Sequence, residues 1–195
     1  MSLLEWIGAL LGVVCVALTI VRSLWCWPVG LGMVAVYLVV FHDARLYADM
    51  GLQAVYIVLQ LYGWWYWWRG TGDRAIAVPV RRIDPRSIAP WCAATIGASW
   101  ALGAALARWT DASLPWWDAT AAVMSLVAQW LMGRRVLESW LVWIAVDALS
   151  IGIFLAKDLL PTAGLYAVFL VMAAVGFATW RRAPRDAMPA TAAIA

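Results

Sequence analysis

The sequence predicts an all-α membrane protein with seven transmembrane helices, arranged as two parallel three-helix repeats and one linker helix. The first observation is composition: 66% of the 195 residues are hydrophobic, only 13% are charged, and the mean hydropathy is +0.82. A soluble globule of this length needs far more polar residues to cover its surface. The other two observations are a series of separate apolar stretches and an internal repeat.

Seven apolar stretches have about the length at which a helix crosses a hydrocarbon core of roughly 30 Å. The first stretch follows no basic segment, carries Glu5 and lacks a small-residue cleavage site, so we expect a retained span and not a signal peptide. The predicted spans are Leu3–Val21, Trp27–Phe41, Leu46–Trp68, Ile88–Ala107, Trp116–Met132, Trp140–Ala156 and Pro161–Trp180.

The third span shows the features of a membrane helix in sequence order. It begins among polar residues near Arg45, is apolar over residues 50–61 except for Gln53 and Gln60, and ends in an aromatic cluster followed by Arg69. Aromatic side chains favour the headgroup region, and arginine favours water. The bilayer alone does not explain the two glutamines.

The segments between and after the spans have compositions typical of loops and chain ends. Residues 69–86 form the only long loop, and their five arginines and two prolines predict a solvated connector. Pro28, Pro115 and Pro161 lie at the ends of spans, where proline is tolerated. The tail from residue 183 onward is rich in alanine and proline and is predicted to be disordered.

The basic residues predict the orientation of the chain in the membrane. Eleven of the 14 fall on one side of the predicted spans, and only Arg45, Arg108 and Lys157 fall on the other. Because cytoplasmic loops carry the excess of arginine and lysine, the amino terminus is expected outside. The long loop and the carboxyl terminus are expected in the cytoplasm.

An offset of 113 positions aligns the chain with itself without a gap. Matches of leucine and valine are expected by chance in so apolar a chain. Matches of tryptophan, glycine and arginine in one register are not. We therefore interpret the offset as an internal duplication. The matched pairs include Arg22 with Arg135, Trp27 with Trp140, Gly51 with Gly164, Gly63 with Gly176, Trp67 with Trp180 and Arg69 with Arg182.

The repeat fixes the expected topology. A unit of three spans ends on the opposite side of the membrane from its start, so two units are parallel only if an extra span joins them. The span at 88–107 has no counterpart under the offset and supplies that linker. We predict a first repeat at 1–69, a cytoplasmic loop and linker helix at 70–110, a second repeat at 111–182 and a disordered tail at 183–195. Parallel repeats of this kind place a ligand site at their interface near the midplane.

Sequence patterns for catalysis, metal binding and nucleic-acid binding are missing. The single histidine, His42, lies beside Asp43 at the outer end of a span, and no zinc-protease, phosphate-loop or serine-triad motif is present. Cys15, Cys26 and Cys92 lack metal-ligand spacing and are expected to be free thiols. The net charge of +3 is explained by basic loops that face anionic lipid. We therefore predict no enzyme, no cofactor, no metal and no nucleic-acid partner.

Polar side chains within the spans are the candidate site, because each costs free energy in lipid and is usually turned inward. They are Gln53, Tyr56 and Gln60 on one face of the third span, Ser125 and Gln129 one turn apart on the fifth, and Asp147 with Ser150 on the sixth. The alternative is that they only join helix to helix, each contributing about 0.6 kcal/mol. We favour this alternative for Ser125 and Ser150, and a ligand site for Gln129 and Asp147.

The 16 tryptophans divide into two groups. Most are expected at the membrane interfaces, among them Trp6, Trp109, Trp116, Trp117 and Trp180. A second group lies on or near faces with polar groups: Trp64, Trp130, Trp140 and Trp143. Because an aromatic face attracts a flat cation, such tryptophans beside an acid suit a positively charged heteroaromatic ligand.

Several of these segments resemble a known family. ARLYADMGLQ followed by YGWWYW, and then AQWLMGRR, ESWLVWIAVDALS and YAVFLVMAAVGFATW, are similar to the Pnu-type vitamin transporters, most closely to the nicotinamide riboside transporters called PnuC. The resemblance covers residues 27–180. It implies a SWEET-like arrangement of three, one and three helices, and a homotrimer.

The resemblance also implies a function and a set of site residues. Members carry a vitamin into the cell as uniporters, by alternating access, and cytoplasmic phosphorylation traps the vitamin for NAD biosynthesis. Tryptophan and tyrosine rings hold the substrate together with amide and carboxylate groups. The matching motifs supply Gln129 and Trp130 of AQWLM, Trp143 and Asp147 of WIAVD, Gln53 and Tyr56 after ADMG, and Tyr62 and Trp64 of YGWW, to which Gln60 and Ser125 are added from the polar faces.

Two alternatives stay open at this stage. Sister members of the family carry thiamine or other vitamins on nearly the same motifs. The alternative of another class is a membrane-embedded enzyme or a receptor. An enzyme should place a nucleophile or metal ligands at one depth, and a receptor should have a sizeable soluble output domain; the sequence shows neither.

Overall fold

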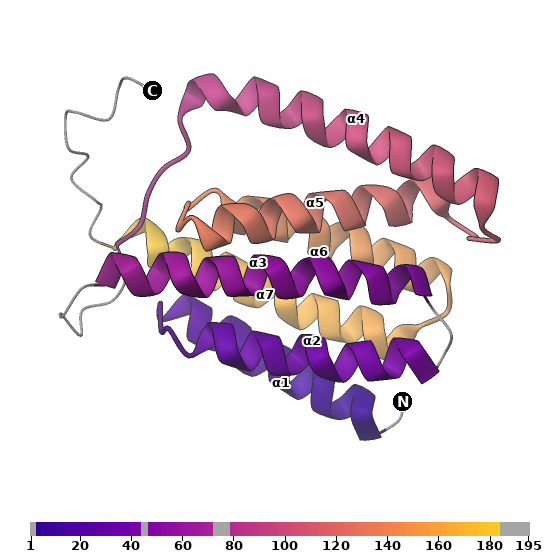
Figure 1. Cartoon of the computed structure of the whole chain (residues 1–195), viewed down its shortest axis with the longest axis horizontal. Helices are drawn as coiled ribbons and strands as arrows, with labels where there is room; N and C mark the ends of the chain where they lie inside the picture. Colours follow the sequence, from indigo (N-terminus) through magenta and orange to yellow (C-terminus); the bar gives the residue numbers. More distant parts are fainter. Residues whose placement is uncertain (1–2, 44–46, 72–78, 184–195) are drawn as a thin grey trace.

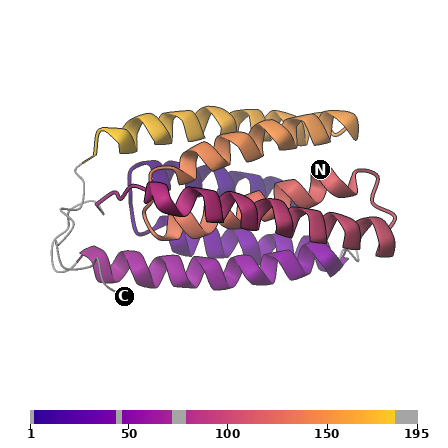
Figure 2. The same ribbon diagram turned by 90° about the horizontal axis from the view of Figure 1, so that it is seen from above.

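The computed structural model describes residues 3–43, 47–71 and 79–183, and these form seven helices that run roughly side by side (Figures 1 and 2). Each predicted span coincides with one helix, so the all-helical prediction is confirmed. Arg45, Leu46 and the tail from residue 184 lie outside the described residues. The helices are α1 (Leu3–Ile20), α2 (Cys26–Asp43), α3 (Tyr47–Thr71), α4 (Pro85–Trp109), α5 (Pro115–Gly133), α6 (Ser139–Ala156) and α7 (Leu160–Arg181).

Local sequence explains where the helices begin. Asp84 caps α4, since its carboxylate accepts a hydrogen bond of 3.0 Å from the backbone N–H of Arg86. Proline occupies the first turn of α4, α5 and α7, where it lacks only an N–H that would have no partner inside the helix. Lys157 at the end of α6 donates to Asp118 in the first turn of α5 at 2.9 Å, which ties these two helix ends together.

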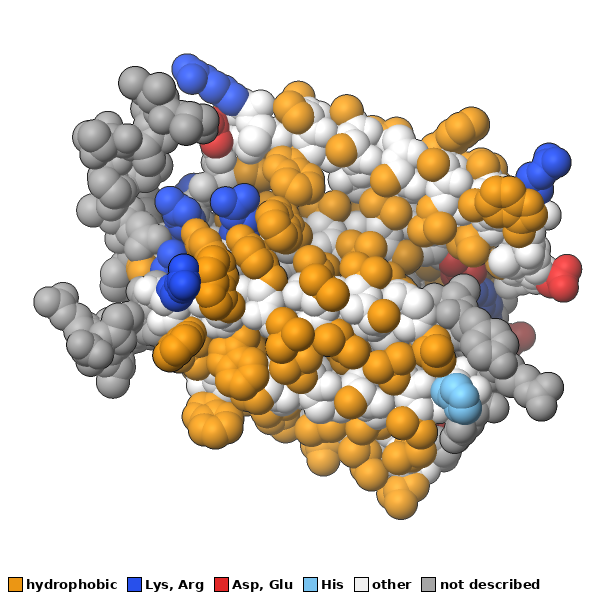
Figure 3. All heavy atoms as spheres, in the orientation of Figure 1, with side chains coloured by type: hydrophobic (Ala, Val, Ile, Leu, Met, Phe, Trp, Pro, Cys, Tyr) orange, Lys and Arg blue, Asp and Glu red, His pale blue; other side chains and the backbone are white. Residues whose placement is uncertain are grey.

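The surface is that of a membrane protein. Among the described helices, α1, α4, α6 and α7 are long and apolar enough to span a bilayer by length and composition, and α2 holds a shorter apolar stretch. α3 and α5 carry the polar candidates. Large apolar side chains such as Trp6, Val58 and Trp100 are more than 60% exposed. Figure 3 shows hydrophobic side chains across the middle of the visible face, with charged side chains gathered near its two ends.

The helices pack as two groups with α4 to one side. α1 contacts α2 and α2 contacts α3, just as α5 contacts α6 and α6 contacts α7. Two further contacts join the groups, α3 with α5 and α1 with α7. Among the described elements, α4 packs against α5 alone, which agrees with its separate position in Figure 1.

The corners after α1 and α5 have the same backbone conformation, 113 positions apart. Arg22 and Arg135 both adopt left-handed φ angles, 59° and 64°. The residue after each donates its N–H five positions back, Ser23 to Leu18 at 2.9 Å and Val136 to Leu131 at 3.0 Å. This pattern is the Schellman end of a helix, in which glycine usually takes the left-handed position.

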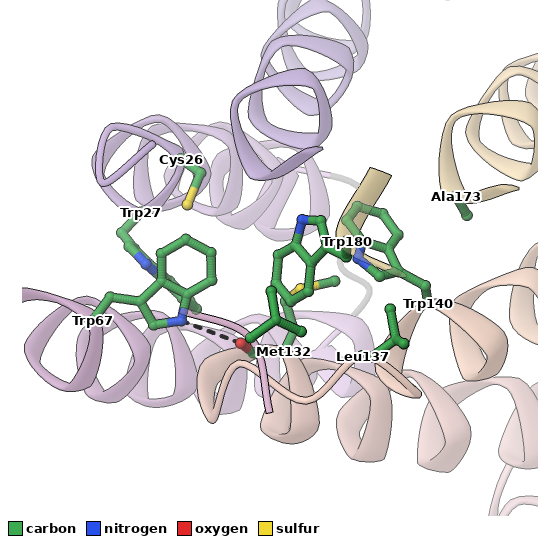
Figure 4. Close-up of a cluster of buried hydrophobic side chains, with 9 residues drawn as sticks. Cys26, Trp27, Trp67, Met132, Leu137, Trp140, Ala173 and Trp180 are labelled. Carbon is green, nitrogen blue, oxygen red and sulfur yellow. Dashed lines mark hydrogen bonds between the residues drawn. The ribbon is translucent and has the colours of Figure 1, made fainter. Parts of the chain in front are cut away.

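Buried tryptophans join the two groups (Figure 4). The indole N–H of Trp67 on α3 donates to the carbonyl of Met132 on α5 at 3.2 Å, and the indole N–H of Trp180 on α7 donates to the carbonyl of Thr19 on α1 at 3.2 Å. Donors and acceptors are each 113 positions apart. The rings of Trp67 and Trp180 meet at 5.9 Å. The prediction of Trp180 as an interface residue is wrong, because its side chain is only 1% exposed inside this core.

Two more tryptophans complete this core at matching positions. Trp27 meets Trp67 edge to face with ring centroids 5.3 Å apart, and Trp140 meets Trp180 in the same way at 5.5 Å. We call Trp27, Trp67, Trp140 and Trp180 the tryptophan plug; each is at most 2% exposed. It lies at the end of the bundle where α3 and α7 finish, which is the arginine-rich end.

The segment before α4 differs from the prediction of a solvated connector. Val80 is buried in the core, and Arg81 pairs through its backbone with the α5–α6 corner. Its N–H donates to the carbonyl of Arg135 at 2.8 Å, and its carbonyl accepts from Leu137 at 2.9 Å. Glu138 of the same corner accepts from the N–H of Ile83 at 2.9 Å. The backbone pairing explains why an arginine-rich segment is packed here.

Candidate functional site

Of the eight buried polar or charged side chains among the described residues, four lie on α3, α5 and α6 away from the helix ends. They are Gln60 on α3, Ser125 on α5, and Asp147 and Ser150 on α6. Asp147 and Gln60 are only 3% and 4% exposed. Burying a polar group in an apolar surrounding costs free energy unless a partner compensates, so groups buried at such a place usually have a function.

Tyr56 and Ser125 join α3 to α5 in the middle of the bundle. The Tyr56 hydroxyl donates to the Ser125 hydroxyl at 2.5 Å, and Ser125 in turn donates to the carbonyl of Ala122 at 2.8 Å. α3 belongs to one packing group and α5 to the other, so this bond lies on the boundary between the groups. The prediction placed both residues in the site, and the structure brings them together.

Tyr166 on α7 is a member of this cluster that sequence reasoning missed. Its hydroxyl lies within electrostatic range of Tyr56, Asp147 and Tyr37, which come from α3, α6 and α2. Phe154 packs beside its ring with centroids 5.1 Å apart. Tyr166 lies 113 positions after Gln53, so the repeat offered a signal for it.

Asp147 supplies the carboxyl group of the cluster. In the described part of the chain, no protein group donates a hydrogen bond to its carboxylate or forms an ion pair with it. A carboxylate in this position can accept hydrogen bonds from a bound molecule or stabilise a cation in the same space. Trp143 lies one helical turn before Asp147, is half-buried and packs against the buried core that contains the tryptophan plug. The cluster and the plug are therefore neighbours along α6.

The three predicted glutamines lie on the same helices as the central cluster. Gln53 and Gln129 are half-buried, three positions before Tyr56 and four after Ser125. Gln60 packs its amide against α2, so closely that a Cβ at Gly30 would collide with it. These three amides lie on the same helices as the central cluster and extend it along α3 and α5.

Tyr62 and Trp130 stack on each other between α3 and α5, with centroids 4.8 Å apart and planes at 13°. The guanidinium carbon of Arg134 lies 5.5 Å from the Trp130 ring, towards the arginine-rich end. The structure does not bring Trp64 to this group, since it is 39% exposed and lies on the outer face of α3 beside Trp65 and Trp68. The periodicity of an apolar helix does not show which of its faces is inward.

The described residues include no group of three or more histidine, cysteine, aspartate or glutamate side chains that could hold a metal ion. Cys15, Cys26 and Cys92 are free thiols, as predicted. The chemistry available to the cluster is that of hydroxyls, amides, one carboxylate and aromatic faces. This set binds a small polar molecule by hydrogen bonds and stacking.

Sequence comparison places the chain among known proteins. The family model described as nicotinamide mononucleotide transporter matches residues 2–182. The chain belongs to that transporter family. It is therefore a membrane transporter by family and not an enzyme.

Three known transporters are similar to the chain over nearly its whole length. The chain is 23% identical to the nicotinamide riboside transporter PnuC of Escherichia coli, with 95% of this chain and 88% of that protein covered. It is 26% identical to PnuC of Neisseria mucosa, covering 93% and 73%. It is 30% identical to the riboflavin/roseoflavin transporter RibM of Streptomyces davaonensis, covering 95% and 88%.

A solved structure has the same fold. The crystal structure of the vitamin B3 transporter PnuC matches with a TM-score of 0.75 and 27% identity, covering 91% of this chain and 80% of that one. The likeness extends over nearly the whole helical part of the chain, so the arrangement of the helices is that of a vitamin transporter of this family.

Proposed function

We propose that the protein carries nicotinamide riboside across the bacterial inner membrane by facilitated diffusion. The observation that carries the proposal is Asp147, a buried carboxyl group with no hydrogen-bond or ion-pair partner among the described residues. The hydroxyl of Tyr166 on α7 interacts electrostatically with Asp147 and also with Tyr56 on α3. Nicotinamide riboside combines a pyridinium cation, a carboxamide and a ribose with several hydroxyls. The cation suits a carboxylate and an indole face, and the other groups suit hydroxyls and amides.

Each side chain has a proposed role. Asp147 stabilises the positive pyridinium, and Trp143, one turn away, offers an indole face to the ring. Tyr56 and Ser125 bind hydroxyl groups, and Tyr166 is added to the site on the basis of its position. The remaining members of the proposed site are Gln53, Gln60 and Gln129, with Tyr62 and Trp130 closing its arginine-rich side. Trp64 is left out because it lies on the outer face of α3.

A SWEET-like frame of two parallel three-helix repeats and a linker helix is part of the proposal. The paired left-handed corners, the reciprocal indole bonds and the two edge-to-face tryptophan pairs all support it, because each relates positions 113 apart. The repeats would occupy residues 1–69 and 111–182. The linker function of α4 is supported by its packing on α5 alone among the described helices.

Alternating access requires that each end of the bundle can open. The tryptophan plug closes the arginine-rich end, which the positive-inside rule assigns to the cytoplasm, with the amino terminus outside. Opening that end would separate Trp67 from Met132 and Trp180 from Thr19 together, since both bonds join the two groups. Uniport then needs no coupling ion, and cytoplasmic phosphorylation of the vitamin would maintain the inward gradient.

Riboflavin is the second candidate substrate. The 30% identity with RibM over 95% of this chain favours it, and the flavin ring is also flat and heteroaromatic. Riboflavin is neutral, however, and gives a buried carboxylate no cation to stabilise. Thiamine, which is cationic, remains the alternative that the sequence motifs suggested.

Calorimetry of the purified protein separates these candidates. We expect nicotinamide riboside to bind more tightly than thiamine, riboflavin or nicotinamide mononucleotide. Asp147→Asn should weaken its binding about 10- to 100-fold, because a hydrogen bond to a charged group contributes roughly 1.5–3 kcal/mol. Asp111→Asn is the matched control, since Asp111 is exposed outside the spans. Tighter binding of riboflavin, or equal affinity of the Asp147 variant and wild type, would show the proposal to be wrong.

The homotrimer implied by the family resemblance is proposed as the assembly. Native mass spectrometry from detergent gives the number of chains directly. A monomer or dimer that transports at the full rate would contradict it.

A further inference from the structure

A hollow on the outer face of α3 lies outside the proposed transport site. It has a volume of about 390 Å³ and is lined by Leu61, Trp64, Trp65 and Trp68. All four side chains are at least 39% exposed. The four positions share one face of the helix, and Val58, one turn before Leu61, is 64% exposed on the same side. We call this hollow the α3 groove.

Cations border the groove at its arginine-rich end. The guanidinium carbon of Arg69 lies 4.3 Å from the centre of the Trp65 ring. From Trp65 a series of aromatic contacts crosses to α5 through Tyr62, at 6.1 Å, and Trp130, at 4.8 Å. The series ends at Arg134, whose guanidinium carbon lies 5.5 Å from the Trp130 ring. Both arginines are exposed, and neither forms an ion pair with a described side chain.

The surrounding acids do not neutralise this edge. Of the acidic side chains described at this end, Asp84 is occupied as the cap of α4 and Glu138 accepts from Ile83 and Arg82. Figure 3 shows lysine or arginine side chains directly beside large hydrophobic ones at the end of α3. The surface therefore combines an apolar hollow with two exposed guanidinium groups.

We propose that the α3 groove binds an anionic phospholipid. Its phosphate would lie at the arginine-rich end of the groove, which Arg69 and Arg134 border, and its acyl chains would follow α3 past Leu61 and Val58. Guanidinium groups bind phosphate oxygens in pairs, and indole rings favour the depth of the glycerol backbone. A soluble anion could pair with the arginines but has no acyl chains to fill the apolar hollow, and the described acids at this end give a second copy of the chain no carboxylates to pair with the two guanidinium groups.

Lipid binding at the α3 groove does not depend on the transport proposal, but the choice of leaflet does. Lipid binding requires only that the chain is a membrane protein, which its family shows. The assignment of the lipid to the cytoplasmic leaflet rests on the proposed orientation. Failure of lipid binding and failure of vitamin transport can therefore be told apart, because the binding assay contains no vitamin.

Native mass spectrometry of the detergent-purified protein tests the site by titration with phosphatidylglycerol and, separately, phosphatidylcholine of the same acyl chains. We expect phosphatidylglycerol to bind at least about 10-fold more tightly. Arg69→Gln with Arg134→Gln should lower that affinity about 25-fold, from roughly 5-fold for each arginine near a lipid surface. The control carries Arg86→Gln with Arg181→Gln, the same charge change at the same end, and should bind as wild type does.

Further variants keep the test decisive. Arg69→Lys with Arg134→Lys should keep part of the preference, because lysine supplies the charge without the paired donors. Trp65→Leu should weaken both lipids while thermal unfolding stays that of a folded protein. Glycerol 3-phosphate, which has the phosphate without the chains, should fail to compete at lipid concentrations that saturate the site.

Four results would overturn the proposal. One is equal binding of the two lipids by the wild type. Another is an equal loss in the control variant, which would indicate general attraction to basic residues. Full competition by glycerol 3-phosphate would indicate a soluble-anion site. A change of oligomeric state in Trp65→Leu without a change in lipid binding would show that a second copy covers the groove.

Discussion

Glycine packing at matched positions gives a quantitative test of the internal duplication. Gly63 lies under the ring of Trp27, and Gly176 lies under the ring of Trp140. A Cβ at Gly176 would be 2.7 Å from three indole atoms, and one at Gly63 would be closer still. Gly51 and Gly164 form a second pair with the same offset. Nothing among the described residues lies within 4 Å of a Cβ added at either position.

The two pairs should respond to alanine in opposite directions. Adding a methyl group to a filled core costs about 1–3 kcal/mol, and the indoles cannot retreat because Trp67 and Trp180 hold their other sides. In an open helical position, alanine instead stabilises by about 0.5–1 kcal/mol, because glycine loses more backbone entropy. We therefore expect Gly63→Ala and Gly176→Ala to unfold at lower temperatures than wild type, and Gly51→Ala and Gly164→Ala at equal or higher ones.

Thermal unfolding in detergent, followed by tryptophan fluorescence, measures all four variants under one condition. The reasoning requires the two members of each pair to behave alike. If Gly63→Ala or Gly176→Ala unfolded at as high a temperature as Gly51→Ala and Gly164→Ala, the close contacts of these glycines with tryptophan rings would be contradicted. If only one member of the tight pair lost stability, the equivalence of the two groups would fail.

Three further predictions concern single contacts. In a double-mutant cycle, Tyr56→Phe and Ser125→Ala should show a coupling energy of about 0.5–1.5 kcal/mol for their hydrogen bond; a coupling near zero would contradict the bond. Asp158→Gly should raise the unfolding temperature, because Asp158 is exposed at a φ of 57° that glycine adopts without strain; a lower temperature would contradict this. Lys157→Gln should cost no more than about 1 kcal/mol, as its ion pair with Asp118 is partly exposed, and less in high salt; a larger, salt-independent loss would indicate a structural role beyond the charge.

Hydrophobic stretches and the repeat were enough to predict the helices. The prediction for the sixth span, Trp140–Ala156, differs from α6 by one residue at its start. Proline in the first turn marked α5 and α7 correctly. These features depend on local sequence alone, because the hydrophobicity of a stretch and the backbone restriction at a proline act without any tertiary contact.

Tertiary position was harder to predict, for a physical reason. A helix in lipid is apolar on all faces, so its sequence does not show which side is inward. Trp64 and Trp180 illustrate this, since the first lies outside and the second in the core, opposite to what was expected. Tyr166 was missed because a lone tyrosine in an apolar helix has no polar neighbour to mark it.

The corner at Arg135 shows a second limit. The pairing of Arg81 with this corner uses backbone N–H and carbonyl groups. Because every residue except proline has both groups, no side-chain pattern predicts the pairing. The five arginines of the preceding loop led us to predict that the whole segment is exposed to water. The backbone of Arg81 nevertheless pairs with the corner, and the buried Val80 holds the segment in place.

Uptake of labelled nicotinamide riboside by liposomes that contain the purified protein tests the proposed function most directly. The account predicts saturable uptake above that of empty vesicles, unchanged by an imposed proton gradient, reduced strongly in Asp147→Asn and preserved in Asp111→Asn. Excess unlabelled nicotinamide riboside should compete better than thiamine or riboflavin. Uptake no faster than in empty vesicles, with the protein folded and inserted, would contradict the account.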